Sequence, residues 1–160
     1  MNVIFISPGY PAEMARFTRG LAQCGAKVIG LGEHATQAIP EEARHALADY
    51  IQVPTLVDTN AVIGRVFEYA RRHPIHRVEC LWEPFMTLAA QLREALEIGG
   101  MHTAQTELFR DKEKMKQALD AAGLRTPRHT TATGGQEIIA AAAKIGYPLI
   151  VKPIAGAGSA

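Results

Sequence analysis

The chain has 160 residues, of which 48% are hydrophobic and 21% are charged, as is typical of folded globular proteins. The formal net charge of +1 argues against binding to nucleic acid or to an anionic membrane surface. Cys24 and Cys80 are the only cysteines and lack metal-ligand spacing, so we expect a reduced, cytoplasmic setting. Residues 1–7 are too short for a signal peptide, and no apolar run approaches the roughly 20 residues of a membrane helix.

Apolar runs alternate with helical patterns through the first hundred residues. The predicted strands are 3–6, 27–31, 50–53 and 77–82, and the predicted helices follow Pro11 and cover 40–48, 59–72 and 84–97. Alternating strands and helices with short connections are typical of a parallel, doubly wound sheet. We therefore predict an α/β, Rossmann-like unit over residues 1–100, which ends where Gly99 and Gly100 interrupt the pattern.

The first predicted helix begins after a turn rich in proline and glycine. Pro11 suits the first helical position, because its fixed φ and missing N–H are tolerated there. Met14, Phe17 and Leu21 are spaced as the inward face of this helix, which is predicted to end near Gly25.

The stretch after residue 109 carries the signals of a second capped helix. Asp111 suits its N-cap, Gly123 stands at the C′ position, and Pro127 prevents the helix from resuming. Its predicted apolar face consists of Met115, Ala118, Leu119 and Ala122. Three lysines lie near its start, at positions 112, 114 and 116. Cations there oppose the helix macrodipole, so these lysines either bind an anion or are simply solvated.

A further basic position follows an apolar run. Leu149–Val151 predicts a strand buried on both faces, and Lys152 comes directly after it. The loop 155–159 is rich in glycine, so its unobstructed N–H groups and the lysine charge suit phosphate. This is not a Walker A motif, because the lysine precedes the glycines. The alternative is a solvated lysine beside a flexible loop.

The segments between these two positions complete the prediction for the last sixty residues. We predict strands at 129–131 and 148–152. Between them, Thr133–Gln136 reads as a capping box for a helix that ends at Ile145.

The ordered set of these motifs resembles the ATP-grasp enzymes, among them biotin carboxylase, carbamoyl phosphate synthetase and many carboxylate–amine ligases. The resemblance is carried by Asp111-Lys112, Ala122-Gly123-Leu124, Thr126-Pro127, Gly146-Tyr147-Pro148, Val151-Lys152-Pro153 and Gly156–Ser159. It implies that Lys112 and Lys152 contact the phosphates of ATP. It also implies that Gly156, Ala157, Gly158 and Ser159 form a lid over those phosphates.

By this resemblance the chain looks like the N-terminal portion of an ATP-grasp ligase. Residues 1–100 would be the Rossmann-like pre-ATP-grasp domain, and residues 101–160 the start of the ATP-grasp domain. The implied reaction uses ATP and Mg²⁺ to phosphorylate a small-molecule carboxylate, and an amine or thiol then attacks the acyl phosphate. The metal ligands are expected beyond residue 160, so we expect this chain alone to be catalytically incomplete, and a homodimer is expected.

Two positions are candidates for a substrate edge, because open α/β sheets bind ligands at the carboxyl ends of their strands. Gly9 follows the first predicted strand, and Glu83 follows the fourth, where it could equally be an ordinary loop carboxylate. Trp82 and Phe85 are predicted to serve packing. Residues 30–35 match a dinucleotide-binding pattern, but they follow the second strand, so we interpret them as a turn, which disfavours a nicotinamide enzyme. The alternative function is a free-standing, non-catalytic Rossmann-like binding or assembly module.

Overall fold

A parallel sheet lies at the centre of the first of the chain's two structural units, Met1–Thr103 and Ala104–Ala160. The structure is a computed structural model and describes residues 1–156. Within these residues the sheet has four strands in the order β3-β2-β1-β4. They are β1 (Asn2–Ile6), β2 (Lys27–Gly32), β3 (Leu47–Gln52) and β4 (Arg77–Glu79). Every pairing among them is parallel, which confirms the predicted α/β, Rossmann-like class.

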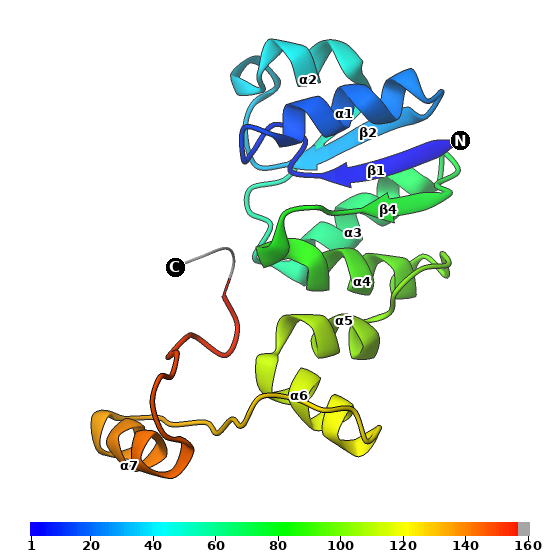
Figure 1. The fold of residues 1–160 in the computed structure, drawn as a ribbon. Coiled ribbons are helices and arrows are strands. Elements are labelled where there is room, and N and C mark those ends of the chain that lie inside the picture. The colour runs from blue at the N-terminus through cyan, green and yellow to red at the C-terminus, as the bar shows by residue number, and fades with distance from the viewer. Residues whose placement is uncertain (157–160) are drawn as a thin grey trace. The chain divides into compact units, whose positions relative to one another are not determined.

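Helices cover both faces of this sheet (Figure 1). One face carries α1 (Met14–Gln23) and α2 (Glu41–Ala46), and the other carries α3 (Thr59–Ala70) and α4 (Met86–Ala95). Successive side chains of a strand point to opposite faces, so Ile4 packs with α3 and α4 while Phe5 packs with α1. Burial on both faces explains why these strands are apolar without alternation. Short 3₁₀ turns, η1 (Thr36–Ala38) and η2 (Glu83–Phe85), precede α2 and α4.

The first helix differs from the prediction in its start and in its inner face. It begins at Met14, and the carbonyl of Pro11 accepts a hydrogen bond from the Met14 N–H at 2.9 Å, so Pro11 lies before the helix. Phe17 is 50% exposed, whereas Thr18 is fully buried. The Thr18 hydroxyl lies 2.7 Å from the carbonyl of Pro8 and 2.9 Å from that of Met14, and this pairing makes its burial tolerable. The predicted inward position of Phe17 was therefore wrong.

Two boundaries in the first unit were also misplaced. The helix predicted over 40–48 ends at Ala46, because Leu47 already pairs with Val28 of β2. The strand predicted over 77–82 has only three residues, and the chain leaves the sheet after Glu79. Both changes are at element ends, where sequence patterns are least informative.

The second unit contains three helices within its described residues: α5 (Thr103–Arg110, whose first residue belongs to the first unit), α6 (Lys112–Ala121) and α7 (Gly135–Ile145). Asp111 caps α6 as predicted, since its side chain accepts from the N–H groups of Glu113 and Lys114. Gly123 has φ +70°, and the Leu124 N–H donates to the Leu119 carbonyl at 3.0 Å. This is a Schellman ending, which confirms the predicted C′ glycine.

The predicted inner face of α6 is only partly covered. Met115 and Leu119 are half-buried, while Ala118 and Ala122 are exposed. Before α7, Gly134 stands at the N-cap position, and the Glu137 carboxylate accepts from the N–H and hydroxyl of Thr133. The capping interaction therefore uses Glu137 and not the predicted Gln136.

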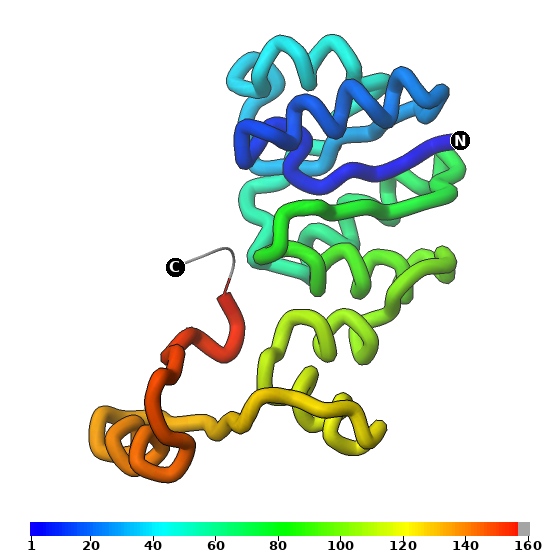
Figure 2. Tube along the Cα trace, viewed as in Figure 1, coloured from blue at the N-terminus to red at the C-terminus, as the bar shows by residue number. Residues whose placement is uncertain are grey.

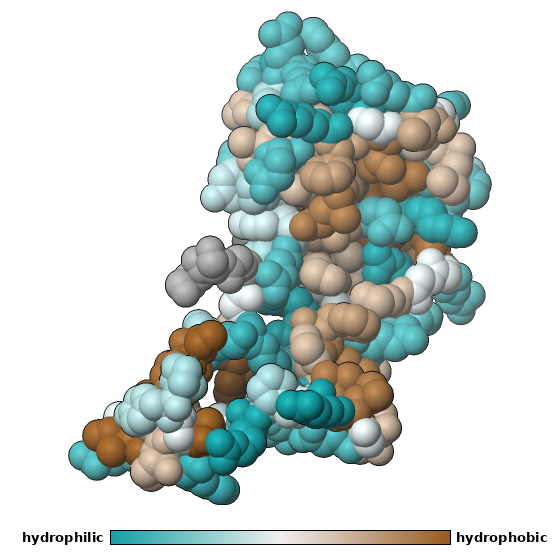
Figure 3. Space-filling view, viewed as in Figure 1, coloured by the Kyte–Doolittle hydropathy of each residue, from teal (hydrophilic) through white to brown (hydrophobic). Residues whose placement is uncertain are grey.

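Neither strand predicted in the second unit forms within the described residues. Residues 129–131 and 148–152 have no ladder partner there, and the chain runs through both segments without regular structure (Figure 2). Ile150 is 82% exposed and Val151 is 64% exposed, so the predicted burial of this run on both faces was wrong. Figure 3 shows apolar side chains on the surface around α7 and the segment that follows it. A strand exists only where a neighbouring strand completes its hydrogen bonds, and an apolar run by itself supplies none.

No helix within residues 1–156 has the length and apolarity that a membrane span requires.

Candidate functional site

The start of α6 meets the segment that follows Lys152. The Lys112 backbone N–H donates to the carbonyl of Ile154 at 3.1 Å, and the Lys112 ammonium lies 3.4 Å from the same oxygen. The Arg110 guanidinium donates to the carbonyl of Gly156 at 3.4 Å. These contacts link residues 42 and 46 positions apart. They bring one predicted phosphate ligand to the segment between Lys152 and the predicted lid.

The three lysines near the start of α6 have different surroundings. Lys114 forms an ion pair of 2.5 Å with Glu107, whose hydrogen bond and charge raise the pKa of Lys114. The Lys116 ammonium lies 3.5 Å from the carbonyl of Pro127. Within residues 1–156, neither Lys112 nor Lys152 has an acidic partner. The two lysines singled out by the motifs therefore keep their charge available to an anion.

The backbone at this helix start is already hydrogen-bonded. Asp111 Oδ1 accepts from the N–H groups of Glu113 and Lys114, both at 2.9 Å, and Ile154 accepts from that of Lys112. These are orphan donors of the first helical turn, and all three have found protein acceptors. An anion here would consequently be held by the lysine side chains and not by the helix terminus.

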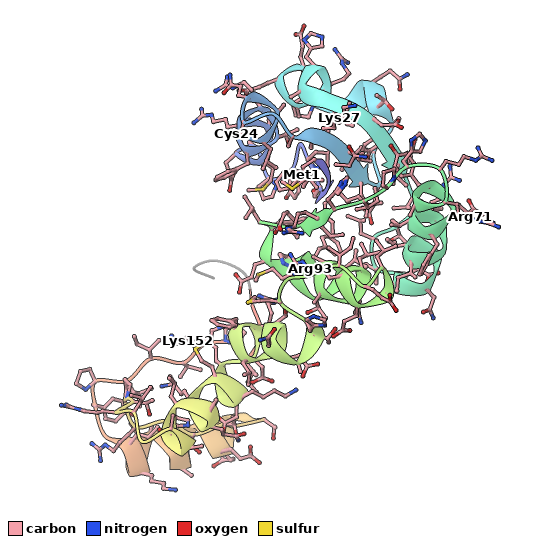
Figure 4. The ribbon with its side chains drawn as sticks, turned by 90° about the vertical axis from the view of Figure 1, so that its right-hand side faces the viewer. Met1, Cys24, Lys27, Arg71, Arg93 and Lys152 are labelled. Carbon is pink, nitrogen blue, oxygen red and sulfur yellow. The ribbon has the colours of Figure 1, made fainter. Side chains whose placement is uncertain are left out.

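Lys152 is exposed on the segment that leads to Ile154 (Figure 4). Gly156 is half-buried and close to Pro153, since an added Cβ would lie 3.4 Å from the Pro153 Cβ. The remaining predicted lid residues, Ala157, Gly158 and Ser159, lie outside the described residues. The contacts of Lys112 with Ile154 thus define the part of the predicted site that the structure describes.

A cavity of about 340 Å³ opens at the carboxyl edge of the sheet in the first unit. Segments that follow all four strands contribute to its wall: 7–10 after β1, 33–34 after β2, Leu56 after β3 and Trp82 after β4. Gly9 lies in this wall, and its role at a substrate edge stays a prediction. Glu83 is half-buried in η2 and is not a lining residue.

Two glycines allow this wall to pack closely. A Cβ on Gly9 would lie 2.5 Å from Pro40 Cδ, and one on Gly32 would lie 2.6 Å from the Tyr50 hydroxyl. Gly30 and Gly32 belong to β2, so the interpretation of residues 30–35 as a turn was wrong for their first half. These glycines make room for the Tyr50 ring, an alternative reason for the pattern that resembled a dinucleotide fingerprint.

Aromatic rings line one part of the cavity. Trp82 packs edge-on against Tyr10, with ring centroids 4.9 Å apart, and against Phe85 at 5.0 Å. Trp82 and Phe85 also contact the main apolar core, which confirms their predicted packing role. The sequence did not reveal that Trp82 and Tyr10 line a cavity as well, because that depends on which loops share the sheet edge.

Glu33 connects the loops after β2 and β3. Its Oε1 accepts from the Leu56 N–H at 2.6 Å and from the Thr55 hydroxyl at 3.0 Å. The Tyr50 hydroxyl donates to the His34 carbonyl at 2.9 Å. Burial, and then the charge of Glu33, raise the pKa of Tyr50 to about 12. The sequence pattern did not single out Glu33, although this residue directly follows β2, as Glu83 was predicted to follow the fourth strand.

Comparisons with known proteins agree with the motifs of the second unit. The family model of the carbamoyl-phosphate synthase L chain, ATP binding domain, matches residues 111–160. The D-alanine–D-alanine ligase of Pseudomonas entomophila is 46% identical over 46 residues, which are 29% of this chain and 14% of that protein. The carbamoyl phosphate synthase large chain of Pseudomonas syringae pv. tomato is 38% identical over 68 residues, 39% of this chain and 6% of that protein.

The chain is also similar to a solved structure. The L-amino acid ligase from Bacillus licheniformis superposes with a TM-score of 0.72 at 25% identity, covering 98% of this chain and 38% of the ligase. The chain therefore spans less than two fifths of that ligase, and 6–24% of the curated relatives that match it first. The family-model match over residues 111–160 and these similarities support the resemblance to ATP-grasp enzymes that the motifs indicate, for a chain that spans only part of the length of such ligases.

Proposed function

We propose that the chain is part of an ATP-dependent ligase that joins a small-molecule carboxylate to an amine or a thiol. The contact of Lys112 with Ile154 carries this proposal. It brings the start of α6 to the segment that contains Lys152 and leads to the predicted lid. The assignment of residues 1–100 as a pre-ATP-grasp domain and of residues 101–160 as the start of the ATP-grasp domain is part of the same proposal.

Lys112 and Lys152 are proposed to bind the phosphates of ATP. Both are free of acidic partners within residues 1–156, so a polyphosphate would meet two uncompensated ammonium groups. In phosphoryl transfer the protein contributes mainly positioning and charge neutralisation, which these lysines suit. Gly156, Ala157, Gly158 and Ser159 are proposed to cover the phosphates, with Arg110 holding the Gly156 carbonyl at the base of this lid.

The nucleotide would supply the phosphoryl group that converts the carboxylate into an acyl phosphate, and the amine or thiol would then displace phosphate from the acyl carbon. Magnesium is proposed to accompany the nucleotide. Within the described residues there is no group of three His, Cys, Asp or Glu side chains placed to hold a metal ion. We therefore assign no residue of this chain to magnesium and derive no step through it.

The carboxyl edge of the sheet in the first unit is proposed as a substrate-binding edge. Gly9 lies in the wall of its cavity, and Glu83 remains a candidate at the end of the neighbouring loop. A reduced cytoplasmic location and a homodimer complete the proposal, and sedimentation of the purified chain at several concentrations measures its oligomeric state.

Calorimetric titration of the chain with ATP tests the proposed ATP site. We expect Lys152→Ala and Lys112→Ala to weaken ATP binding at least tenfold, or about 1.4 kcal/mol. Lys114→Ala is the matched control, because its ammonium is already paired with Glu107 and should not contribute. Unchanged ATP affinity in Lys152→Ala would refute the assignment, and an equal loss in Lys114→Ala would reduce it to a general charge effect.

A further inference from the structure

The wall of the cavity in the first unit contains few charged side chains. Among its described lining residues there is one carboxylate, Glu33, one imidazole, His34, and neither lysine nor arginine. A carboxylate or phosphate ligand would be desolvated there beside Glu33 without a cation to compensate it. The lining therefore favours a neutral or positively charged ligand.

The position of the Glu33 carboxylate is fixed by its own contacts. Oε1 is held by the Leu56 N–H and the Thr55 hydroxyl, while Oε2 has no hydrogen bond to the described residues. The carboxylate is therefore held in one orientation, and no basic side chain of the described residues pairs with it. Its influence within the cavity is visible at Tyr50, whose pKa it helps to raise. A bound ammonium group would find a preplaced acceptor in Glu33.

The rest of the wall suits the body of a small cationic ligand. Tyr10, Tyr50 and Trp82 all line the cavity, and aromatic faces attract cations. Ile39 and Leu56 add apolar surface. The volume of about 340 Å³ lies at the lower end of the range for small-molecule sites, roughly 300–1,000 Å³.

We infer that this cavity binds a primary ammonium group carried on an apolar or aromatic body, with Glu33 as the counter-ion and Tyr10 and Trp82 as the aromatic wall. The inference rests on the proposed function and assigns the cavity to the amine substrate and not to the carboxylate. The amine and the phosphates of ATP would then be recognised by different residues of this chain, Glu33 for the amine and Lys112 and Lys152 for the phosphates.

Trp82 provides the readout, because it is the chain's only tryptophan and lines the cavity. The experiment titrates the full chain near neutral pH, without nucleotide, and follows Trp82 fluorescence. The probes are 2-phenylethylamine and 3-phenylpropionate, which share a phenyl ring and differ in charge. We expect a saturable change with the amine and none with the carboxylate at the same concentrations. Binding of the carboxylate as tight as that of the amine would overturn the inference.

Glu33→Gln tests the counter-ion, since the amide keeps an Oε1 acceptor for Leu56 and removes the charge. We expect at least tenfold weaker amine binding in this variant. Glu68→Gln is the matched control: Glu68 pairs with Arg65 on α3, away from this cavity, and its loss should leave the affinity unchanged. Equal amine affinity in Glu33→Gln and in the unmodified chain would also overturn the inference.

Tyr10→Leu provides a second variant if Glu33→Gln does not fold. Tyr10 is 55% exposed, so its replacement should leave the fold intact and weaken amine binding several-fold through loss of the ring. Unchanged amine binding in Tyr10→Leu would overturn the aromatic part of the site. ATP titration of the same samples separates the two proposals: ATP binding without amine binding refutes only this inference, and amine binding without ATP binding refutes only the nucleotide site.

Discussion

Two apolar runs of the chain have the same character and different outcomes. Val3–Ile6 in the first unit lies within β1 and is buried on both faces, whereas Leu149–Val151 in the second unit has no regular structure and is largely exposed. β1 pairs with β2 on one side and β4 on the other, and helices cover its faces. No strand within residues 1–156 offers such a partner to Leu149–Val151. Apolarity predicts what a segment prefers to contact, and the partners decide whether it becomes a strand.

The largest difference is expected from one substitution made in both runs. Ile4→Ala removes a fully buried side chain and should lower the free energy of unfolding of the first unit by about 2–5 kcal/mol. Ile150→Ala removes a side chain that is 82% exposed and should change it by no more than about 0.5 kcal/mol. Urea titrations followed by Trp82 fluorescence and circular dichroism measure both. Comparable losses in the two variants would show that Leu149–Val151 is buried in solution.

Alkaline pH should affect the first unit through a buried thiol. Burial is the main cause that raises the pKa of Cys80 from 9.0 to about 11. Because the folded-state pKa is the higher one, the stabilisation is complete below pH 9 and is lost as the pH rises through about 11. The loss attributable to the thiol is on the order of 2 kcal/mol. Urea titrations between these pH values measure it.

Cys80→Ala supplies the control for this effect, because it lacks the titrating group. Its stability should fall less steeply between pH 9 and about 11 than that of the unmodified chain. A parallel loss in the two proteins would assign the alkaline transition to other groups, such as Tyr50 and Tyr69, whose pKa values are raised to about 12.

The fold of the first unit was accessible from sequence because each local signal agreed with the global arrangement. The apolar runs at 3–6 and 27–31 had strands as neighbours and helices as cover, so pattern and structure coincided. Phe17 was misassigned because Thr18 occupies the inner face of α1 instead. The Thr18 hydroxyl can be buried there because it hydrogen-bonds with backbone carbonyls. That compensation depends on the turn at Pro8, which periodicity does not reveal.

The two candidate sites also differ in how much of them the sequence could predict. Lys112 and Lys152 stand in ordered motifs, so sequence alone could single them out, although their binding role stays a prediction. The cavity lined by Glu33, Tyr10 and Trp82 could not be foreseen, because its residues come from loops joined only by the strand order. Gly9 was placed at that edge by the rule for parallel sheets, whereas Glu83 was placed outside the wall by the turn η2.

Removing a helix cap should have different consequences for stability in the two units. Asp58 caps α3 through the Ala61 N–H, and Asp111 caps α6. Each cap contributes about 1 kcal/mol to its helix. Asp58→Ala should lower the stability of the whole first unit, since α3 buries Val62 and Val66. Asp111→Ala should mainly cause local fraying, because α6 has no buried side chain among the described residues.

Urea titration reported by Trp82 and amide hydrogen exchange in α6 distinguish these two outcomes. Asp58→Asn and Asp111→Asn are the controls, because asparagine keeps a capping oxygen and should preserve most of the stabilisation that each cap provides. A loss of global stability in Asp111→Ala as large as in Asp58→Ala would show that α6 is integrated into a cooperative core.

The smallest effect is expected at the exposed start of α7 in acid. The Thr133 N–H, and then its hydroxyl, hold the pKa of Glu137 below its ordinary value of 4.5. Because the folded-state pKa is the lower one, this contribution is present above pH 4.5 and is lost as the pH falls through the folded-state value. A carboxyl titration by NMR should therefore find a midpoint below 4.5, and Thr133→Ala, which keeps the N–H and removes the hydroxyl, should move it only part of the way back. A midpoint unaffected by that substitution would make the backbone N–H the whole cause of the lowered pKa of Glu137. A midpoint at or above 4.5 in the unmodified chain would instead mean that the contact between Glu137 and Thr133 does not form in solution. In that case the second unit would differ from the first in its helix ends as well as in its unpaired apolar run.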